Sequence, residues 1–133
     1  MAFSLRLRRQ SRLLEVVFDT AEGYAFTCEY LRVMSPSAEV RGHGPGQEVL
    51  QVRKEKVHIT QVEPVGHYAV RLHFDDGHNS GLYSWPFLLD LGRQMDRHWT
   101  QYLDRLARFS VERVADAPHA GPGHRLPAAS DLV

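Results

Sequence analysis

Residues 68–92, YAVRLHFDDGHNSGLYSWPFLLDLG, decide the fold because a strand, a tight turn and a helix start follow one another there. At the beginning of this stretch every second residue is large and apolar: Tyr68, Val70, Leu72 and Phe74. That alternation predicts a strand with one buried face. Asp76-Gly77 is a strong hairpin signal, so a short returning strand is predicted up to Tyr83.

Two helices are predicted after this hairpin. Ser84 is a good N-cap and Pro86 is tolerated in a first turn, which favours a short helix over residues 85–91 that stops at Gly92. A second helix is predicted over 93–108, because apolar residues recur there on one stripe at helical spacing. The stripe consists of Met95, Trp99, Tyr102, Leu103 and Leu106. We expect both tryptophans, Trp85 and Trp99, to be buried between the helices and the sheet.

The first half of the chain has the pattern of strands. Alternating leucine and arginine over residues 5–8 indicates a strand with one solvated face. An opening hairpin is predicted from strands 12–18 and 24–28, and a further strand near 57–63. One helical turn fits 29–34, before a proline ends it. Strands first and helices last predict an α+β fold, in which an antiparallel or mixed sheet is followed by two C-terminal helices.

The end of the chain differs from the rest in composition. Residues 115–133 contain three prolines, two glycines and five alanines, with no hydrophobic periodicity. Such a segment offers little apolar surface to bury. We therefore predict one domain over residues 1–110, followed by a disordered tail over residues 111–133.

Bulk composition excludes several classes of partner. Sixteen basic residues balance sixteen acidic ones among 133, so no overall charge attracts nucleic acid or an anionic membrane. A single cysteine, Cys28, makes an internal disulfide impossible and fits a reducing compartment. No apolar run has the length of a signal peptide core or a membrane span. We expect a cytoplasmic protein with neither nucleic-acid nor membrane partners.

No complete catalytic set is found. His73-Phe74-Asp75 has the spacing of part of an iron-binding facial triad, but such oxygenases need a far larger jelly-roll, so a solvent-facing strand pair is the simpler interpretation. The glycine-rich residues 42–46 lack the lysine of a phosphate-binding loop, and Cys28 lies in an apolar strand pattern typical of a core residue. An enzyme is therefore not expected, and no catalytic residue is assigned.

Several motifs in a fixed order carry a family resemblance. They are Tyr30-Leu31-Arg32, Ser35–Val40, Arg41–Gln47, Val62–Gly66 and Asp75–Trp85. Over residues 10–108 the chain resembles the gamma-butyrobetaine hydroxylase-like N-terminal domain family. The resemblance implies a small α+β domain. In the hydroxylases this domain precedes the catalytic jelly-roll and holds a structural zinc through three cysteines and one histidine. In some plant proteins a similar domain is attached to an iron–sulfur scaffold ATPase.

The zinc ligands implied by the resemblance can be placed on this sequence. The histidine of the family's Asp-Gly-His motif falls on His78, and the cysteines fall near Ser35, Ser37 and Val40. None of those three residues is a thiol, and structural zinc needs thiolate or imidazole ligands. We therefore predict no cofactor and no structural metal.

Two hypotheses for function remain open. The first is a binding or adaptor module with a protein partner, serving an iron–sulfur or oxygenase system in trans. Its candidate binding residues lie near the glycine-rich and Asp-Gly-His loops: Arg32, His43, Asp76, His78, Tyr83 and Trp85. The alternative is a metal-binding protein or a metal-dependent enzyme that holds zinc or iron through His78 and neighbouring histidines such as His43.

Overall fold

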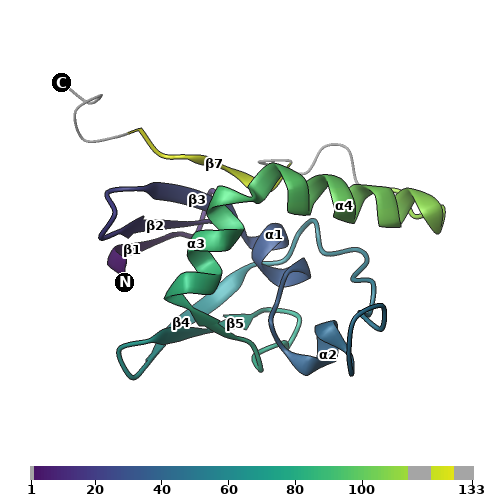
Figure 1. The fold of residues 1–133 in the computed structure, drawn as a ribbon, viewed down its shortest axis with the longest axis horizontal. Helices are drawn as coiled ribbons and strands as arrows, with labels where there is room; N and C mark the ends of the chain where they lie inside the picture. Colours follow the sequence, from purple (N-terminus) through teal and green to yellow (C-terminus); the bar gives the residue numbers. More distant parts are fainter. Residues whose placement is uncertain (1, 114–120, 128–133) are drawn as a thin grey trace.

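The computed structural model describes residues 2–113 and 121–127, which form two antiparallel sheets and four helices (Figure 1). The first sheet has the order β1-β2-β3-β7, with strands Ala2–Arg8, Leu13–Phe18, Gly23–Thr27 and Gly123–Arg125. The second has the order β4-β5-β6, with strands Ile59–Val65, Ala69–Phe74 and Leu82–Ser84. The helices are α1 (Cys28–Val33), α2 (Ala38–Arg41), α3 (Trp85–Arg93) and α4 (Met95–Arg108). This confirms the α+β fold.

The predicted single sheet is divided into two. Thr27 ends β3 and at once caps α1, since its Oγ1 accepts a hydrogen bond from the Tyr30 amide at 3.1 Å. The chain therefore turns away from the first sheet and begins β4 only after α2 and a long loop. The free edge of β3 pairs with β7 instead of with β4.

The core lies between the two sheets and the helices. The inward positions of β2 are Leu14, Val16 and Phe18, and those of β5 are Val70, Leu72 and Phe74, all buried. Helix α1 passes through the centre, and all six of its residues are buried. Its two charged side chains are paired there, Glu29 with Arg113 and Arg32 with Asp76. Pairing is what makes such burial tolerable, because an isolated buried charge is costly.

Helix α3 begins as predicted but ends later. The Ser84 hydroxyl caps it by accepting from the Phe87 amide at 3.3 Å. Gly92 lies inside the helix instead of ending it. Glycine is needed at this position because a Cβ there would meet the Tyr24 ring at 2.5 Å. The glycine therefore serves close packing of α3 on β3. Trp99 is buried, as expected, but Trp85 is only half-buried, and its indole N–H donates to the His67 carbonyl at 2.7 Å.

The predicted disordered tail includes a strand. Residues 123–125 pair with β3, the Thr27 amide donates to Pro122 O, and the Leu126 amide donates to Gly23 O. Backbone pairing at a sheet edge needs no hydrophobic periodicity, which is why composition alone gave the wrong prediction for 121–127. Residues 111–113, also predicted as tail, are bonded to the domain: the Val111 amide donates to Leu106 O, and Arg113 pairs with Glu29. The remainder of the predicted tail, 114–120 and 128–133, lies outside the described residues. Among those described, no helix is long and apolar enough to cross a bilayer.

Candidate functional site

His78 is the centre of a hydrogen-bonded cluster that joins the β5–β6 turn to the segment after α1. Its Nε2 lies 2.8 Å from Ser35 Oγ, and its Nδ1 lies 3.0 Å from Glu39 Oε2. Ser37 Oγ lies 2.6 Å from Ser80 Oγ on the turn. We call these five residues, Ser35, Ser37, Glu39, His78 and Ser80, the His78 cluster. The cluster therefore joins distant parts of the chain: His78 is 39 positions from Glu39 and 43 positions from Ser35.

The surroundings of His78 suit a neutral ring. A carboxylate only accepts, so Nδ1 carries the hydrogen toward Glu39, and in the neutral ring Nε2 then accepts from the Ser35 hydroxyl. Ser35 Oγ in turn accepts from the Ser37 amide at 3.2 Å. Burial lowers the pKa of His78 below its ordinary value, and the Arg32 guanidinium lowers it further, although Glu39 acts in the opposite direction. The neutral ring satisfies every polar atom that it faces.

The Ser35 hydroxyl, the His78 imidazole and the Glu39 carboxylate are arranged in the order of a nucleophile, a base and an orienting acid. Accessibility separates this cluster from a hydrolase site. Ser35 has no exposed surface, and a Cβ added at Gly81 would lie 2.5 Å from its Oγ. A nucleophile must reach its substrate, and Ser35 is closed off by the turn that covers it. The cluster acts as a link between two segments.

Three of these residues, Ser35, Ser37 and His78, occupy positions that the family resemblance assigns to zinc. The structure brings Ser35 to His78 and Ser37 close to Ser35, so the geometry of convergence is present. The donor atoms do not fit, because hydroxyls replace thiolates and Val40 offers no donor. Across residues 2–113 and 121–127, no group of three or more His, Cys, Asp or Glu side chains is placed to hold a metal ion. Both His78 ring nitrogens are also already bonded, which leaves none to share with His43.

Arg32 and Asp76, two further predicted binding residues, bond to each other. Arg32 Nε donates to Asp76 Oδ2 at 2.9 Å, and Lys54 Nζ reaches the same oxygen at 2.6 Å. Asp76 Oδ1 accepts from the His78 amide at 3.2 Å, which shapes the turn. Burial raises the pKa of Asp76, but these bonds outweigh it and lower the pKa to about 2. The pair therefore anchors the turn to α1.

The remaining predicted residues do not converge on one site. Tyr83 is fully buried, and its hydroxyl donates to the Leu31 carbonyl at 2.6 Å. Trp85 lies at the start of α3, bonded to the turn between β4 and β5. His43 is exposed in the loop after α2. Arg32, Asp76, His78 and Tyr83 thus make internal contacts near the end of α1.

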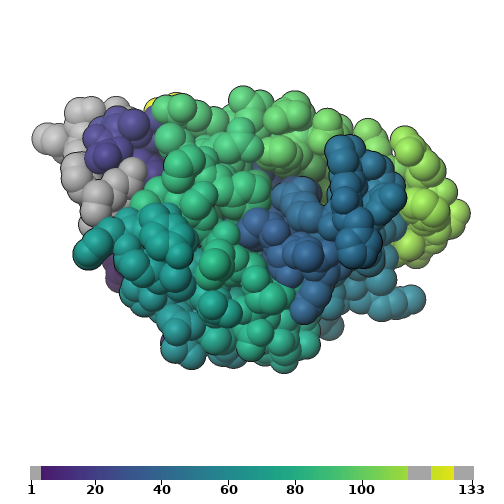
Figure 2. All heavy atoms as spheres, turned by 60° about the horizontal axis from the view of Figure 1, so that its bottom comes forward, coloured from purple at the N-terminus to yellow at the C-terminus, as the bar shows by residue number. Residues whose placement is uncertain are grey.

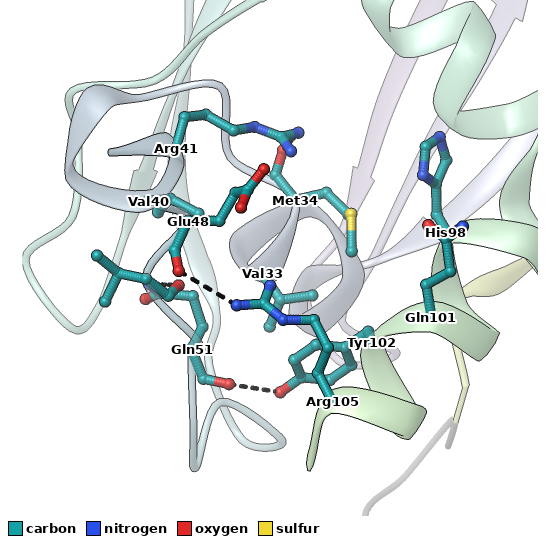
Figure 3. A pocket seen from close by; sticks show the side chains of 11 residues that line it. Val33, Met34, Val40, Arg41, Glu48, Gln51, His98, Gln101, Tyr102 and Arg105 are labelled. Atoms are coloured by element: carbon teal, nitrogen blue, oxygen red, sulfur yellow. Dashed lines mark hydrogen bonds between the residues drawn. The ribbon is translucent and has the colours of Figure 1, made fainter. Parts of the chain in front are cut away.

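An open pocket that the sequence did not indicate lies at the end of α1 (Figure 3). It has a volume of about 220 Å³ between the end of α1, helix α2, residues 48–51 and α4. Its lining comprises Val33, Met34, Val40, Arg41, Glu48, Val49, Gln51, His98, Gln101, Tyr102 and Arg105. We call it the arginine pocket. In Figure 2 the blue segment that carries α2 and the following loop stands beside the green surface of α4.

Two arginines shape this pocket. Arg105 Nη2 donates to the Glu48 carbonyl at 3.2 Å, and Tyr102 OH donates to the Gln51 carbonyl at 2.8 Å, so α4 holds the loop in place (Figure 3). Arg41 Nη2 donates to the Met34 carbonyl at 3.0 Å, and its guanidinium lies over the Phe87 ring. Both arginines bond carbonyls, which satisfies part of each donor fork and pairs neither guanidinium with a carboxylate. Arg41 belongs to the Arg41–Gln47 motif, but no local sequence pattern indicated Arg105 as a binding residue.

Comparison with known proteins places the fold and the family. No curated protein matches the chain. An NMR solution structure with 40% identity covers 90% of this chain and 94% of its own, with a TM-score of 0.73. Another, with 48% identity, covers 84% of this chain and 83% of its own, with a TM-score of 0.72.

A third similar structure is a crystal structure at 1.93 Å resolution from Acidithiobacillus ferrooxidans, of a protein with unknown function in the DUF971 family. It has 38% identity, covers 68% of this chain and 90% of its own, and has a TM-score of 0.57. The family model "Gamma-butyrobetaine hydroxylase-like, N-terminal" matches residues 5–89, which is more than half of the chain. This chain therefore belongs to the gamma-butyrobetaine hydroxylase-like N-terminal family.

Proposed function

We propose that this chain is a protein-binding adaptor whose contact surface is the arginine pocket. The observation that carries the proposal is the pair of half-buried guanidinium groups, Arg41 and Arg105, in one open concavity. Within the described ranges, neither is bonded to a carboxylate. Arginine is enriched among the residues that dominate binding energy at protein interfaces, and its planar fork suits carboxylate groups of a partner.

The size of the pocket favours a protein over a free small molecule. Sites for cofactors and drug-sized ligands usually measure about 300–1,000 Å³. A pocket of about 220 Å³ suits one anchoring side chain of a larger partner. Val49 on its rim is 53% exposed and supplies apolar contact area beside the charges.

The closed His78 cluster favours binding over catalysis. Its hydroxyls and imidazole are bonded to one another, and Ser35 has no exposed surface. A reaction there would require the β5–β6 turn to lift from α1. The arginine pocket needs no such opening.

The domains found beside members of this family indicate which class of protein the partner belongs to. Its members occur beside an oxygenase domain or, in a similar form, beside an iron–sulfur scaffold ATPase. We propose that this chain meets such an iron–sulfur or oxygenase protein in trans, in the cytoplasm. The balanced charge of the chain argues against nucleic acid and membrane as partners.

Capture from lysate of the source organism tests this proposal. Gln101→Trp places an indole in the pocket, and Thr100→Trp places the same group on the neighbouring exposed position of α4, outside the pocket lining. We expect one protein to be retained by the wild type and by Thr100→Trp, lost with Gln101→Trp, and to carry iron by elemental analysis. Equal retention by both variants would contradict the assignment of the surface, and a retained partner without iron would contradict the class.

A further inference from the structure

The charges that line the arginine pocket do not cancel. Arg41 and Arg105 contribute two positive charges, and Glu48 contributes one negative charge. No ion pair links Glu48 to either arginine in the part of the chain that the structure describes. His98 is bonded through Nε2 to Asp90 Oδ2 at 3.1 Å, so its imidazole already has an acidic neighbour. One positive charge is therefore left over inside the pocket.

The donors in the pocket are directed by contacts with carbonyls. Arg105 reaches from α4 toward the loop at Glu48, and Arg41 reaches from α2 toward Met34 (Figure 3). Each bond engages one nitrogen and leaves other N–H groups of the same planar fork unused. The carbonyl contacts also order the two side chains in advance, which lowers the entropy lost when a ligand binds.

The floor of the pocket is apolar. Val33, Met34 and Val40 contribute apolar side chains to its lining, and both valines are buried. These apolar side chains beside two arginines suit an occupant that carries a negative group on a short hydrocarbon stem. Glu48 adds repulsion against a second negative charge, which favours a monoanionic carboxylate over a dianionic phosphate.

We propose that the arginine pocket binds one carboxylate of a partner polypeptide, held by Arg41 and Arg105. This inference rests on the proposed function and names the chemistry that the surface recognises. Two sources present this chemistry: the side chain of a glutamate, and the free C-terminus of a chain that ends in an apolar residue. Both have the stem that the floor requires.

Titration of isotope-labelled protein, followed by two-dimensional NMR, tests the proposal and separates the two sources. The first probe is N-acetylglutamate N-methylamide, with N-acetylglutamine N-methylamide as its neutral match. The second is N-acetylleucine, with N-acetylleucine amide as its match. Inorganic phosphate is the third. We expect saturable shifts at the amides of Val33, Met34 and Gln101 with at least one carboxylate, and binding at least about tenfold weaker for its neutral match.

Charge-removing variants locate the binding. Arg41→Gln and Arg105→Gln should each weaken binding of the carboxylate about tenfold, since each removes a charge-assisted hydrogen bond. Arg108→Gln, an exposed arginine further along α4 and outside the pocket lining, should leave binding unchanged. The dispersion of the same spectra verifies that each variant is folded.

Several outcomes would overturn the carboxylate assignment. These are no saturable shift at millimolar carboxylate, equal binding of the neutral match, tighter binding of phosphate, or equal weakening by Arg108→Gln. If any of these occurs while Gln101→Trp still abolishes partner capture, the pocket remains the contact surface and only its chemistry has been misassigned. If both experiments fail, the proposed function fails as well.

Discussion

Replacing Tyr83 by phenylalanine should destabilise the protein through a single hydroxyl. At the end of α1 the Met34 amide donates to Tyr30 O and the Ser35 amide donates to Arg32 O, so the Leu31 carbonyl is left to the Tyr83 hydroxyl, 2.6 Å away. Tyr83 has no exposed surface, so water cannot take over when the hydroxyl is removed. A buried acceptor left without a donor costs about 1–3 kcal/mol.

Urea unfolding followed by tryptophan fluorescence measures this cost. We expect Tyr83→Phe to lower the free energy of unfolding by about 1–3 kcal/mol at an unchanged m-value, and to lower Tm by roughly 3–5 °C for each kcal/mol. Tyr68→Phe is the matched control, because Tyr68 is 59% exposed, and it should change stability by less than about 0.5 kcal/mol. If Tyr83→Phe were as neutral as the control, the role assigned to Tyr83 as a cap for α1 would be refuted.

Three further predictions follow from the same structure. Folding lowers the pKa of His78, so the unfolded chain binds a proton at His78 more readily and the free energy of unfolding should fall as pH drops below about 6.5. His78→Gln should therefore lose less stability between pH 7 and pH 5 than the wild type does, and equal losses would contradict the assignment. Gly123→Ala places a Cβ 1.8 Å from Ala25 O and should detach β7, which faster hydrogen exchange at the Thr27 amide would report. Gly121→Ala, also at positive φ but with open space around it, should have less effect, and equal exchange in the two variants would argue against the clash. Elemental analysis should find well under one zinc or iron per chain, and a chelator should leave the thermal melt unmoved; one bound metal that His78→Ala removes would restore the metal hypothesis.

The parts of the fold that the sequence predicted are those with strong local signals. The alternation in residues 70–74, the Asp76-Gly77 turn and the Ser84 cap all act within a few residues, and each lies where it was predicted. Tyr68, predicted on the buried face, precedes β5 and is exposed. Strand β7 was missed because its pairing with β3 depends on backbone groups and on space at Gly123, neither of which leaves a hydrophobic pattern. The division into two sheets was missed because Thr27 acts both as the last residue of β3 and as the cap of α1.

In the candidate site, too, residues in sequence motifs were predicted, and residues brought together by tertiary packing were not. His78 and Ser35 were paired in advance only through the family motifs, and their 2.8 Å contact agrees with that pairing. The arginine pocket was not predicted, because Arg41 and Arg105 are brought together by tertiary packing across 64 positions of sequence. Charged residues on separate helices have no shared periodicity from which such a meeting could be inferred.

Site-specific photo-crosslinking tests most directly whether the arginine pocket is the contact surface. A benzophenone amino acid is introduced at Gln101, inside the pocket, and separately at Thr100, outside its lining, in cells of the source organism. We predict one discrete protein adduct from position 101, absent from position 100 and absent when Arg41→Gln and Arg105→Gln are added. No adduct at position 101, or the same adduct from both positions, would contradict the central claim.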